Sequence, residues 1–202
     1  MMRRLPLVLA SFAITAPALA QDPPPAPRAI QLPDTMGANF PASDTLTATS
    51  GPTDYDFLVG AWRFTFQGRG RDGSFTAPFT GHWVFTKKQT GDKGVLLEDH
   101  WRPDDPTSTW DAGTWTYRAW NPERKLWEME GINTARGAWQ PGLMWTAGES
   151  RLLTEWYGPM LVRFRYFAIQ PDKFLWRADA TFDRGRTWIR DYWTMEAHRI
   201  SR

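Results

Sequence analysis

Apolar and polar residues alternate along most of the chain after residue 54. The clearest segment is 174–180, where every second residue is apolar and small or aromatic: Phe174, Trp176, Ala178 and Ala180. A period of two puts successive side chains on opposite faces of a β-strand, whereas a helix repeats every 3.6 residues. The pattern therefore predicts strands that bury one face, and no stretch has convincing helical spacing.

About ten such strands are expected, separated by turns rich in glycine, proline, asparagine and aspartate. Their expected ranges are 57–67, 75–87, 95–102, 110–120, 126–134, 137–146, 150–157, 160–169, 173–182 and 187–198. Regular short strands joined by tight turns are typical of an up-and-down barrel or a sandwich. We favour a single antiparallel up-and-down β-barrel in an all-β fold, because closure removes exposed strand edges.

The first 20 residues have the pattern of a cleavable export signal. Two arginines precede an apolar stretch over residues 5–16, and Ala18-Leu19-Ala20 follows. This arrangement is typical of a signal peptide that is cut after Ala20. The apolar stretch is shorter than the ~20 residues that a membrane helix needs. We therefore expect a periplasmic or secreted protein with no integral membrane segment after cleavage.

Composition divides the remaining chain into a leader and one domain. Residues 21–53 are rich in proline and small polar residues, which predicts a disordered leader. Residues 54–202 have the size of a single domain and contain all 13 tryptophans. Aromatic side chains bury ~150–250 Å² each, so most of the tryptophans are expected in the core.

Charge and cysteine content exclude several classes of partner. The signal contains two of the 24 basic residues and none of the 22 acidic ones, so the exported protein has equal numbers of both. A nucleic-acid partner is not expected, because no basic run is present. The chain has no cysteine, so it has neither a disulfide framework nor a cysteine nucleophile.

The segment Gly60-Ala61-Trp62 matches the Gly-x-Trp of the first strand in calycin-type barrels, the lipocalin and fatty-acid-binding superfamily. With Asp56-Phe57-Leu58 before it and Thr187-Trp188 after a late turn, the chain resembles the DUF1579-type bacterial lipocalin-like proteins of unknown function. The resemblance covers residues 54–199. It implies that Trp62 closes the barrel floor and that a late arginine, Arg190 or Arg199, packs over it.

Fatty-acid-binding proteins hold a ligand carboxylate with an Arg-x-Tyr pair on the last strand, which Arg190 and Tyr192 match. The register of the last hairpin decides whether this pair faces the lumen. If the loop is residues 184–185, Arg190 points outward. If it is residues 183–185, Ala178 faces Arg190 and the pair points inward.

The leading hypothesis is a barrel that binds a small apolar or amphipathic molecule. The expected lining residues are Trp115, Tyr117, Trp127, Trp176, Arg190 and Tyr192. One alternative is an enzyme on the same barrel, a cyclase, isomerase or hydrolase of a hydrophobic substrate. Glu98 and His100 would be its first acid and base to test.

Two further alternatives stay open. A haem-binding, nitrobindin-like barrel would use a late histidine, and His198 is late, but the glycine-rich run that follows Gly-x-Trp in nitrobindins is missing. A structural or interaction protein would fill its barrel with side chains. The spacing of the three histidines predicts no metal site, and no cofactor is expected.

Overall fold

The computed structural model describes residues 50–70, 73–92, 94–107, 113–134 and 137–202. The predicted signal, residues 1–20, and residues 21–49 of the predicted leader lie outside this part. Within the described ranges, no helix has the length and apolarity that a membrane crossing requires.

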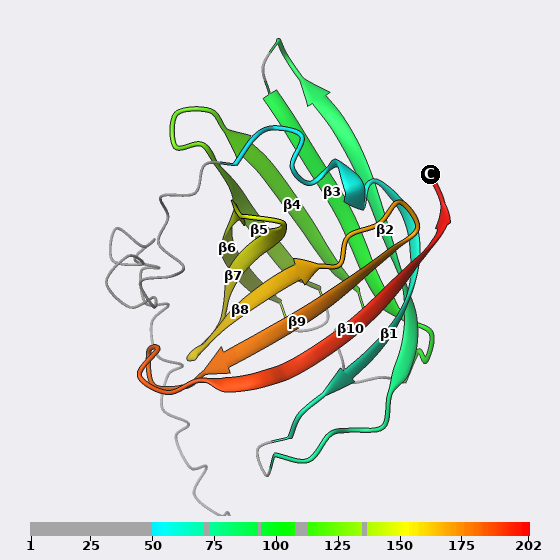
Figure 1. Cartoon of the computed structure of the whole chain (residues 1–202), viewed down its shortest axis with the longest axis vertical. Coiled ribbons are helices and arrows are strands. Elements are labelled where there is room, and N and C mark those ends of the chain that lie inside the picture. The colour runs from blue at the N-terminus through cyan, green and yellow to red at the C-terminus, as the bar shows by residue number, and fades with distance from the viewer. Residues whose placement is uncertain (1–49, 71–72, 93, 108–112, 135–136) are drawn as a thin grey trace, which may run out of the picture. The chain divides into compact units, whose positions relative to one another are not determined.

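Ten antiparallel strands form a closed up-and-down barrel, which confirms the predicted fold class (Figure 1). The strands are β1 (Gly60–Gly68), β2 (Phe79–Thr90), β3 (Gly94–Pro103), β4 (Thr114–Asn121), β5 (Leu126–Asn133), β6 (Ala138–Ala147), β7 (Ser150–Tyr157), β8 (Met160–Phe167), β9 (Lys173–Thr181) and β10 (Ile189–Ser201). Each strand pairs with its neighbours in sequence, and β1 closes the sheet by pairing with β10.

The chain enters the barrel through residues that were assigned to the leader. The Ser50 N–H donates to the Lys125 carbonyl at 3.0 Å, and the Trp127 indole N–H donates to the Gly51 carbonyl at 3.1 Å. Residues 50–53 are therefore joined to the barrel by hydrogen bonds, although their composition resembles the preceding segment.

The barrel floor is built where β1 begins. A short 3-10 turn, η2 (Asp56–Leu58), precedes β1 and buries Leu58. Trp62 is fully buried, and Arg199 lies opposite it on β10. The Arg199 guanidinium carbon is 4.0 Å from the centroid of the Trp62 ring. Arg199 is thus the arginine that packs over Trp62, while Arg190 lies elsewhere.

Arg199 also ties the floor turn to the last strand. Its Nη1 donates to the Val59 carbonyl at 2.5 Å, and its Nη2 donates to the Phe57 carbonyl at 2.7 Å. Gly60 follows with φ of 118°, and a Cβ there would clash with the Ser201 carbonyl oxygen. The glycine of Gly-x-Trp is required because β10 passes too close for a side chain.

The last hairpin has neither of the two registers considered from the sequence. Ile189 pairs with Ala180, as expected for a loop of residues 184–185, but Trp193 pairs with Ala178. Two extra residues are therefore accommodated in β10 between Ile189 and Trp193, which is a β-bulge. The bulge turns Trp193 into the barrel, a position that simple turn counting assigned to Arg190 or Asp191.

Asp183 organises the loop of this hairpin, residues 182–188. Its carboxylate accepts hydrogen bonds from the Thr181 hydroxyl at 2.8 Å, the Thr187 N–H at 2.9 Å and the Thr187 hydroxyl at 2.6 Å. The hydrogen bonds from Thr187, and then that from Thr181, lower the pKa of Asp183 to about 2. The Thr-x-Asp-x-Gly-x-Thr-Trp sequence, residues 181–188, accordingly stabilises the loop of this hairpin. We call the hydrogen bonds of Asp183 with Thr181 and Thr187 the Asp183 staple.

Replacing Arg199 by alanine should lower the free energy of unfolding by about 2–4 kcal/mol, because three charge-assisted hydrogen bonds, one of them to the Pro171 carbonyl, and a cation–π contact are lost. Urea unfolding followed by far-ultraviolet circular dichroism measures the change. The control is Arg102→Ala, which removes an exposed arginine from β3 and should change stability by no more than about 0.5 kcal/mol. Equal effects of the two variants would contradict the role of Arg199 in the floor.

The Asp183 staple predicts a specific loss of stability in acid. The folded pKa of about 2 lies below the unfolded value of ~3.9, so the ionised carboxylate stabilises the fold above about pH 4. That contribution disappears as the pH falls towards 2. In Asp183→Asn, the melting temperature should therefore fall less steeply over this interval than in the wild type. Parallel curves in differential scanning calorimetry would show that the staple does not contribute.

Candidate functional site

The barrel contains a cavity of about 580 Å³. It extends from the middle of the barrel to the end where β7 turns into β8 and β9 into β10. Its lining is Phe66, Trp83, Asp99, Trp101, Thr114, Thr116, Arg118, Met129, Leu153, Glu155, Tyr157, Pro159, Met160, Phe164, Tyr166, Trp176, Phe182, Tyr192, Trp193 and Met195. The opposite end is occupied by the floor, where Trp62 and its neighbours are packed.

One side of the cavity is a continuous aromatic wall across β1, β10, β9 and β8. The Phe164 and Trp176 rings stack with centroids 4.7 Å apart, and Phe164 and Trp193 stack at 5.9 Å. Phe66 extends the wall, 6.0 Å from Trp176 and 6.3 Å from Trp193. Neighbouring strands supply these rings in register, because each strand turns alternate residues inward. The wall offers flat apolar contacts to a ligand.

The other side carries buried charges on β3 and β4. Arg118 forms an ion pair with Asp99, and the two side chains are 2% and 0% exposed. The Trp83 indole N–H donates to the second Asp99 oxygen at 2.5 Å. Burial lowers the pKa of Arg118 from its ordinary value, and charge interactions with neighbours that include Tyr166 and Glu155 oppose this. A desolvated ion pair is costly unless other hydrogen bonds support it.

A second carboxyl group faces the same space from β7. Glu155 is 6% exposed, and one of its oxygens accepts a hydrogen bond from the Tyr157 hydroxyl at 2.9 Å. Burial raises the pKa of the nearby Tyr166 to about 12, so this phenol is protonated at neutral pH. We call Asp99, Arg118, Glu155 and Tyr157 the lumen cluster.

The structure separates the predicted lining residues into three groups. Trp176 and Tyr192 line the cavity. Trp127 is fully buried beneath the cavity, where it packs against Tyr55 with ring centroids 5.7 Å apart. Trp115 and Tyr117 lie on the outer face, 38% and 36% exposed, so they are not part of the lining.

Arg190 also lies outside the barrel, against the expectation of an inward Arg-x-Tyr pair. Its guanidinium is 66% exposed and forms an ion pair with Asp179. The β10 bulge separates the two members of the pair, since Tyr192 reaches the cavity and Arg190 does not.

The first candidates for an acid and a base, Glu98 and His100, point away from the lumen. Glu98 forms an ion pair with Lys88 at 2.6 Å. The His100 ring stacks on Trp115 with centroids 4.4 Å apart, and burial and then Arg102 lower its pKa. The face they share is opposite to that of Asp99, which lines the cavity.

None of the three histidines lines the cavity. His198 is exposed on β10 and contacts Glu196 at 2.7 Å, so it does not offer an axial ligand to a haem in the lumen. Within the described residues, no three or more His, Cys, Asp and Glu side chains are grouped to hold a metal ion.

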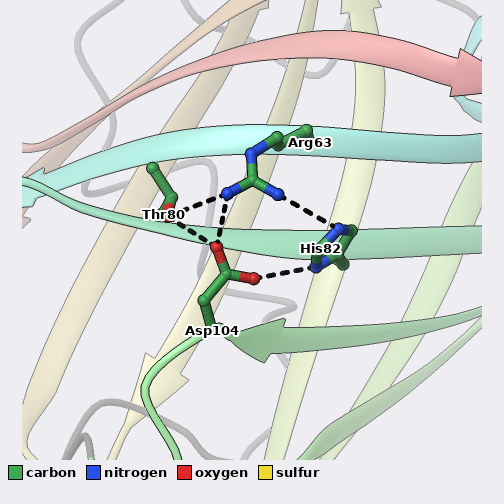
Figure 2. A network of polar contacts seen from close by, with 4 residues as sticks. All are labelled: Arg63, Thr80, His82 and Asp104. Carbon is green, nitrogen blue, oxygen red and sulfur yellow. Dashed lines mark hydrogen bonds and ion pairs between the residues drawn. The ribbon is translucent and has the colours of Figure 1, made fainter.

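The third histidine belongs to a polar network on the outer surface, which Figure 2 shows. His82 Nδ1 lies 2.9 Å from one Asp104 oxygen, and Arg63 lies 2.8 Å from the other. The Thr80 hydroxyl donates to the latter oxygen at 2.6 Å. The Thr80 hydrogen bond lowers the pKa of Asp104 most strongly, burial opposes it, and the charges of Arg63 and then His82 lower the pKa further. The network fastens the start of the β3–β4 connection to β1 and β2.

Sequence reasoning missed Asp99, Arg118 and Glu155. The sequence-based prediction placed Trp115 and Tyr117 on the inner face of β4 because they are aromatic. It therefore placed Arg118 on the outer face. The inward face of β5 was predicted correctly from Trp127, and Arg118 pairs across the β4–β5 turn with Met129, which shares that face. Carrying the register across that turn would have put Arg118 in the lumen.

No family model and no curated protein matches the chain. Among solved structures, the S-type phycobiliprotein lyase CPES from Guillardia theta is similar with a TM-score of 0.51 and 11% identity, over 72% of this chain and 89% of that one. Rv2717c from M. tuberculosis has a TM-score of 0.42 and 12% identity, over 75% and 98%. At this identity the likeness to the lyase concerns the fold alone.

Two adjacent residues on opposite faces of β3 give a matched test of the lumen cluster. Asp99→Asn should lower the free energy of unfolding by about 3–5 kcal/mol, because it leaves the Arg118 charge buried without its partner. Glu98→Gln removes only an exposed ion pair and should cost no more than about 1 kcal/mol. Guanidinium denaturation measures both, and similar losses would mean that the Asp99–Arg118 pair is not desolvated.

Proposed function

We propose that this protein is an exported barrel that binds a small amphipathic molecule in its lumen. The observation that carries the proposal is the cavity of about 580 Å³ with an aromatic wall on one side and a buried charged cluster on the other. Ligand pockets in proteins have volumes of roughly 300–1,000 Å³ and are mostly apolar with a few placed polar groups. Export is proposed on the signal-like first 20 residues.

The two walls assign the two parts of the ligand. The stacked rings of Phe164, Trp176 and Trp193 favour an apolar body, flat or chain-like, because burial of apolar area drives binding. The lumen cluster favours one polar group at the β3–β4 side. Burying the charged side chains of Asp99 and Arg118 costs free energy. A lumen that contains them in spite of this cost is compatible with ligand selection by hydrogen bonds.

Charge balance indicates the character of that polar group. Asp99 and Glu155 place two carboxyl groups beside the single guanidinium of Arg118. A ligand carboxylate would add a further negative charge in a low-dielectric space, whereas an ammonium or a hydrogen-bond donor would balance it. We therefore propose a cationic or donor head group, in place of the carboxylate that an inward Arg190–Tyr192 pair would have bound.

The enzyme alternative loses its first candidates, because Glu98 and His100 lie on the outer face. The barrel-filling alternative is disfavoured by the size of the cavity. Membership of the DUF1579-type lipocalin-like proteins stays part of the proposal, supported by Gly60-Ala61-Trp62 at the start of β1.

The test compares dodecylamine, dodecanol and dodecanoate at neutral pH, the amine and the carboxylate below their critical micelle concentrations and the alcohol below its solubility limit. Because the cavity lining contains Trp83, Trp101, Trp176 and Trp193, binding should change tryptophan fluorescence, and calorimetry should give the affinities. We expect dodecylamine to bind most tightly and dodecanoate least tightly. Glu155→Gln should weaken amine binding about tenfold, which is ~1.4 kcal/mol, and Glu98→Gln should leave it unchanged.

Each result has a clear meaning. Absence of binding by all three probes, with no carried ligand in native mass spectra of the protein from its own host, would refute the binding function. Tightest binding by dodecanoate would retain the binding function and refute the charge assignment. Trp115→Phe, on the outer face, should leave the fluorescence change intact, whereas Trp176→Phe should reduce it.

A further inference from the structure

The strands β8, β9 and β10 lie side by side in the barrel wall (Figure 1). Four arginines converge on the outer surface of this region. They surround a hollow of about 220 Å³ whose lining includes Arg163, Arg165, Arg177, Arg190 and Asp179, together with residues of β6 and β7. We call it the arginine hollow. Its side chains belong to the face opposite to the lumen, so it is separate from the proposed ligand cavity.

Two of these arginines face each other across a strand pair. Arg165 on β8 is directly opposite Arg177 on β9. Like charges in this position destabilise a sheet unless something neutralises them. Among the residues that the structure describes, the one ion-pair contact of Arg177 is a long one, 3.9 Å, to Asp191. Arg165 lies 5.2 Å from the Phe167 ring centroid, and within the described chain no carboxylate is within ion-pair distance of it.

The nearest carboxylate, Asp179, is already engaged. It accepts from Arg163 at 3.2 Å and from the Asp191 N–H at 3.1 Å, and it pairs with Arg190. Four guanidinium groups therefore face two carboxylates, Asp179 and Asp191, which leaves an excess of positive charge. Arg163 is held in place with only 9% of its side chain exposed, so part of this charge is fixed in position.

The β10 bulge brings the fourth arginine to the hollow. It inserts two residues opposite β9, and Asp191 has a φ of 48°. A positive φ costs free energy for a residue other than glycine, and such strain often accompanies functional sites. Here the strained backbone puts the Asp191 N–H and the Arg190 guanidinium on the same carboxylate, Asp179.

We propose that the arginine hollow binds a phosphate-type oxyanion. Guanidinium groups present parallel N–H donors that match two oxygens of such an anion. An anion between Arg165 and Arg177 would neutralise their repulsion and use donors that Asp179 does not reach. The same chemistry is offered by free inorganic phosphate and by the phosphodiester of a lipid head group.

The experiment uses the exported chain, residues 21–202, and two probes. Isothermal titration calorimetry measures inorganic phosphate, and co-sedimentation measures phosphatidylglycerol–phosphatidylcholine vesicles against pure phosphatidylcholine vesicles. We expect binding to at least one anionic probe, weakened by added sodium chloride. The double variant Arg165→Gln/Arg177→Gln should weaken it about tenfold or more. Arg102→Gln/Arg124→Gln removes the same charge elsewhere and should change it less than about twofold.

The pattern of results separates the sources and tests the site. Binding of phosphate assigns the free anion, and binding of the anionic vesicles alone assigns the lipid head group. No binding of either probe, or equal loss in both double variants, would overturn the proposal. In phosphate-free buffer, Arg165→Gln/Arg177→Gln should melt no lower than the wild type, because it relieves like-charge repulsion. A lower melting temperature would instead show that the two arginines are structural.

Discussion

Closure of the sheet between β1 and β10 is the constraint on which the other features depend. Once Trp62 lies opposite both Trp83 and Arg199, every strand has a fixed inner and outer face, since a slip of one residue would exchange them. Arg199 secures this register by bonding the floor turn from the last strand. The aromatic wall, the lumen cluster and the arginine hollow all follow from that alternation.

The sequence predicted the number and approximate limits of the strands, because period-two alternation and turn residues are local signals. It assigned β5 and β9 to the correct faces, because large apolar residues, Trp127 and Trp176, mark the inward side of each strand. It failed on β4, where Trp115 is outside and Arg118 inside. Side-chain type is a poor guide to the faces of β4. Trp115 packs on His100 outside the barrel, and Arg118 is neutralised by Asp99 inside it. Both are contacts between β4 and β3, which the local pattern of one strand does not reveal.

The prediction of the register of the last hairpin failed for a different reason. Turn counting assumes an uninterrupted ladder, and the inserted residues of β10 interrupt it. A bulge of this kind has no strong sequence signature when no glycine marks it, and Asp191 adopts a positive φ without one. The Arg190–Tyr192 pair was therefore divided between two surfaces by a backbone feature that only the structure reveals.

The same bulge divides the pairing of β9 with β10 into two registers. On the side of the loop, Ile189 pairs with Ala180 in one register. On the side of the floor, Trp193 pairs with Ala178 and begins a second register that continues along β10. The loop at residues 182–188 therefore joins the barrel through a ladder that is already interrupted, so a change in its length need not shift the register of Trp193 and the residues after it. The rim of the cavity, which Phe182 and Tyr192 help to form, can thus differ in shape while the pairing at the floor, where Trp62 lies opposite Arg199, is kept.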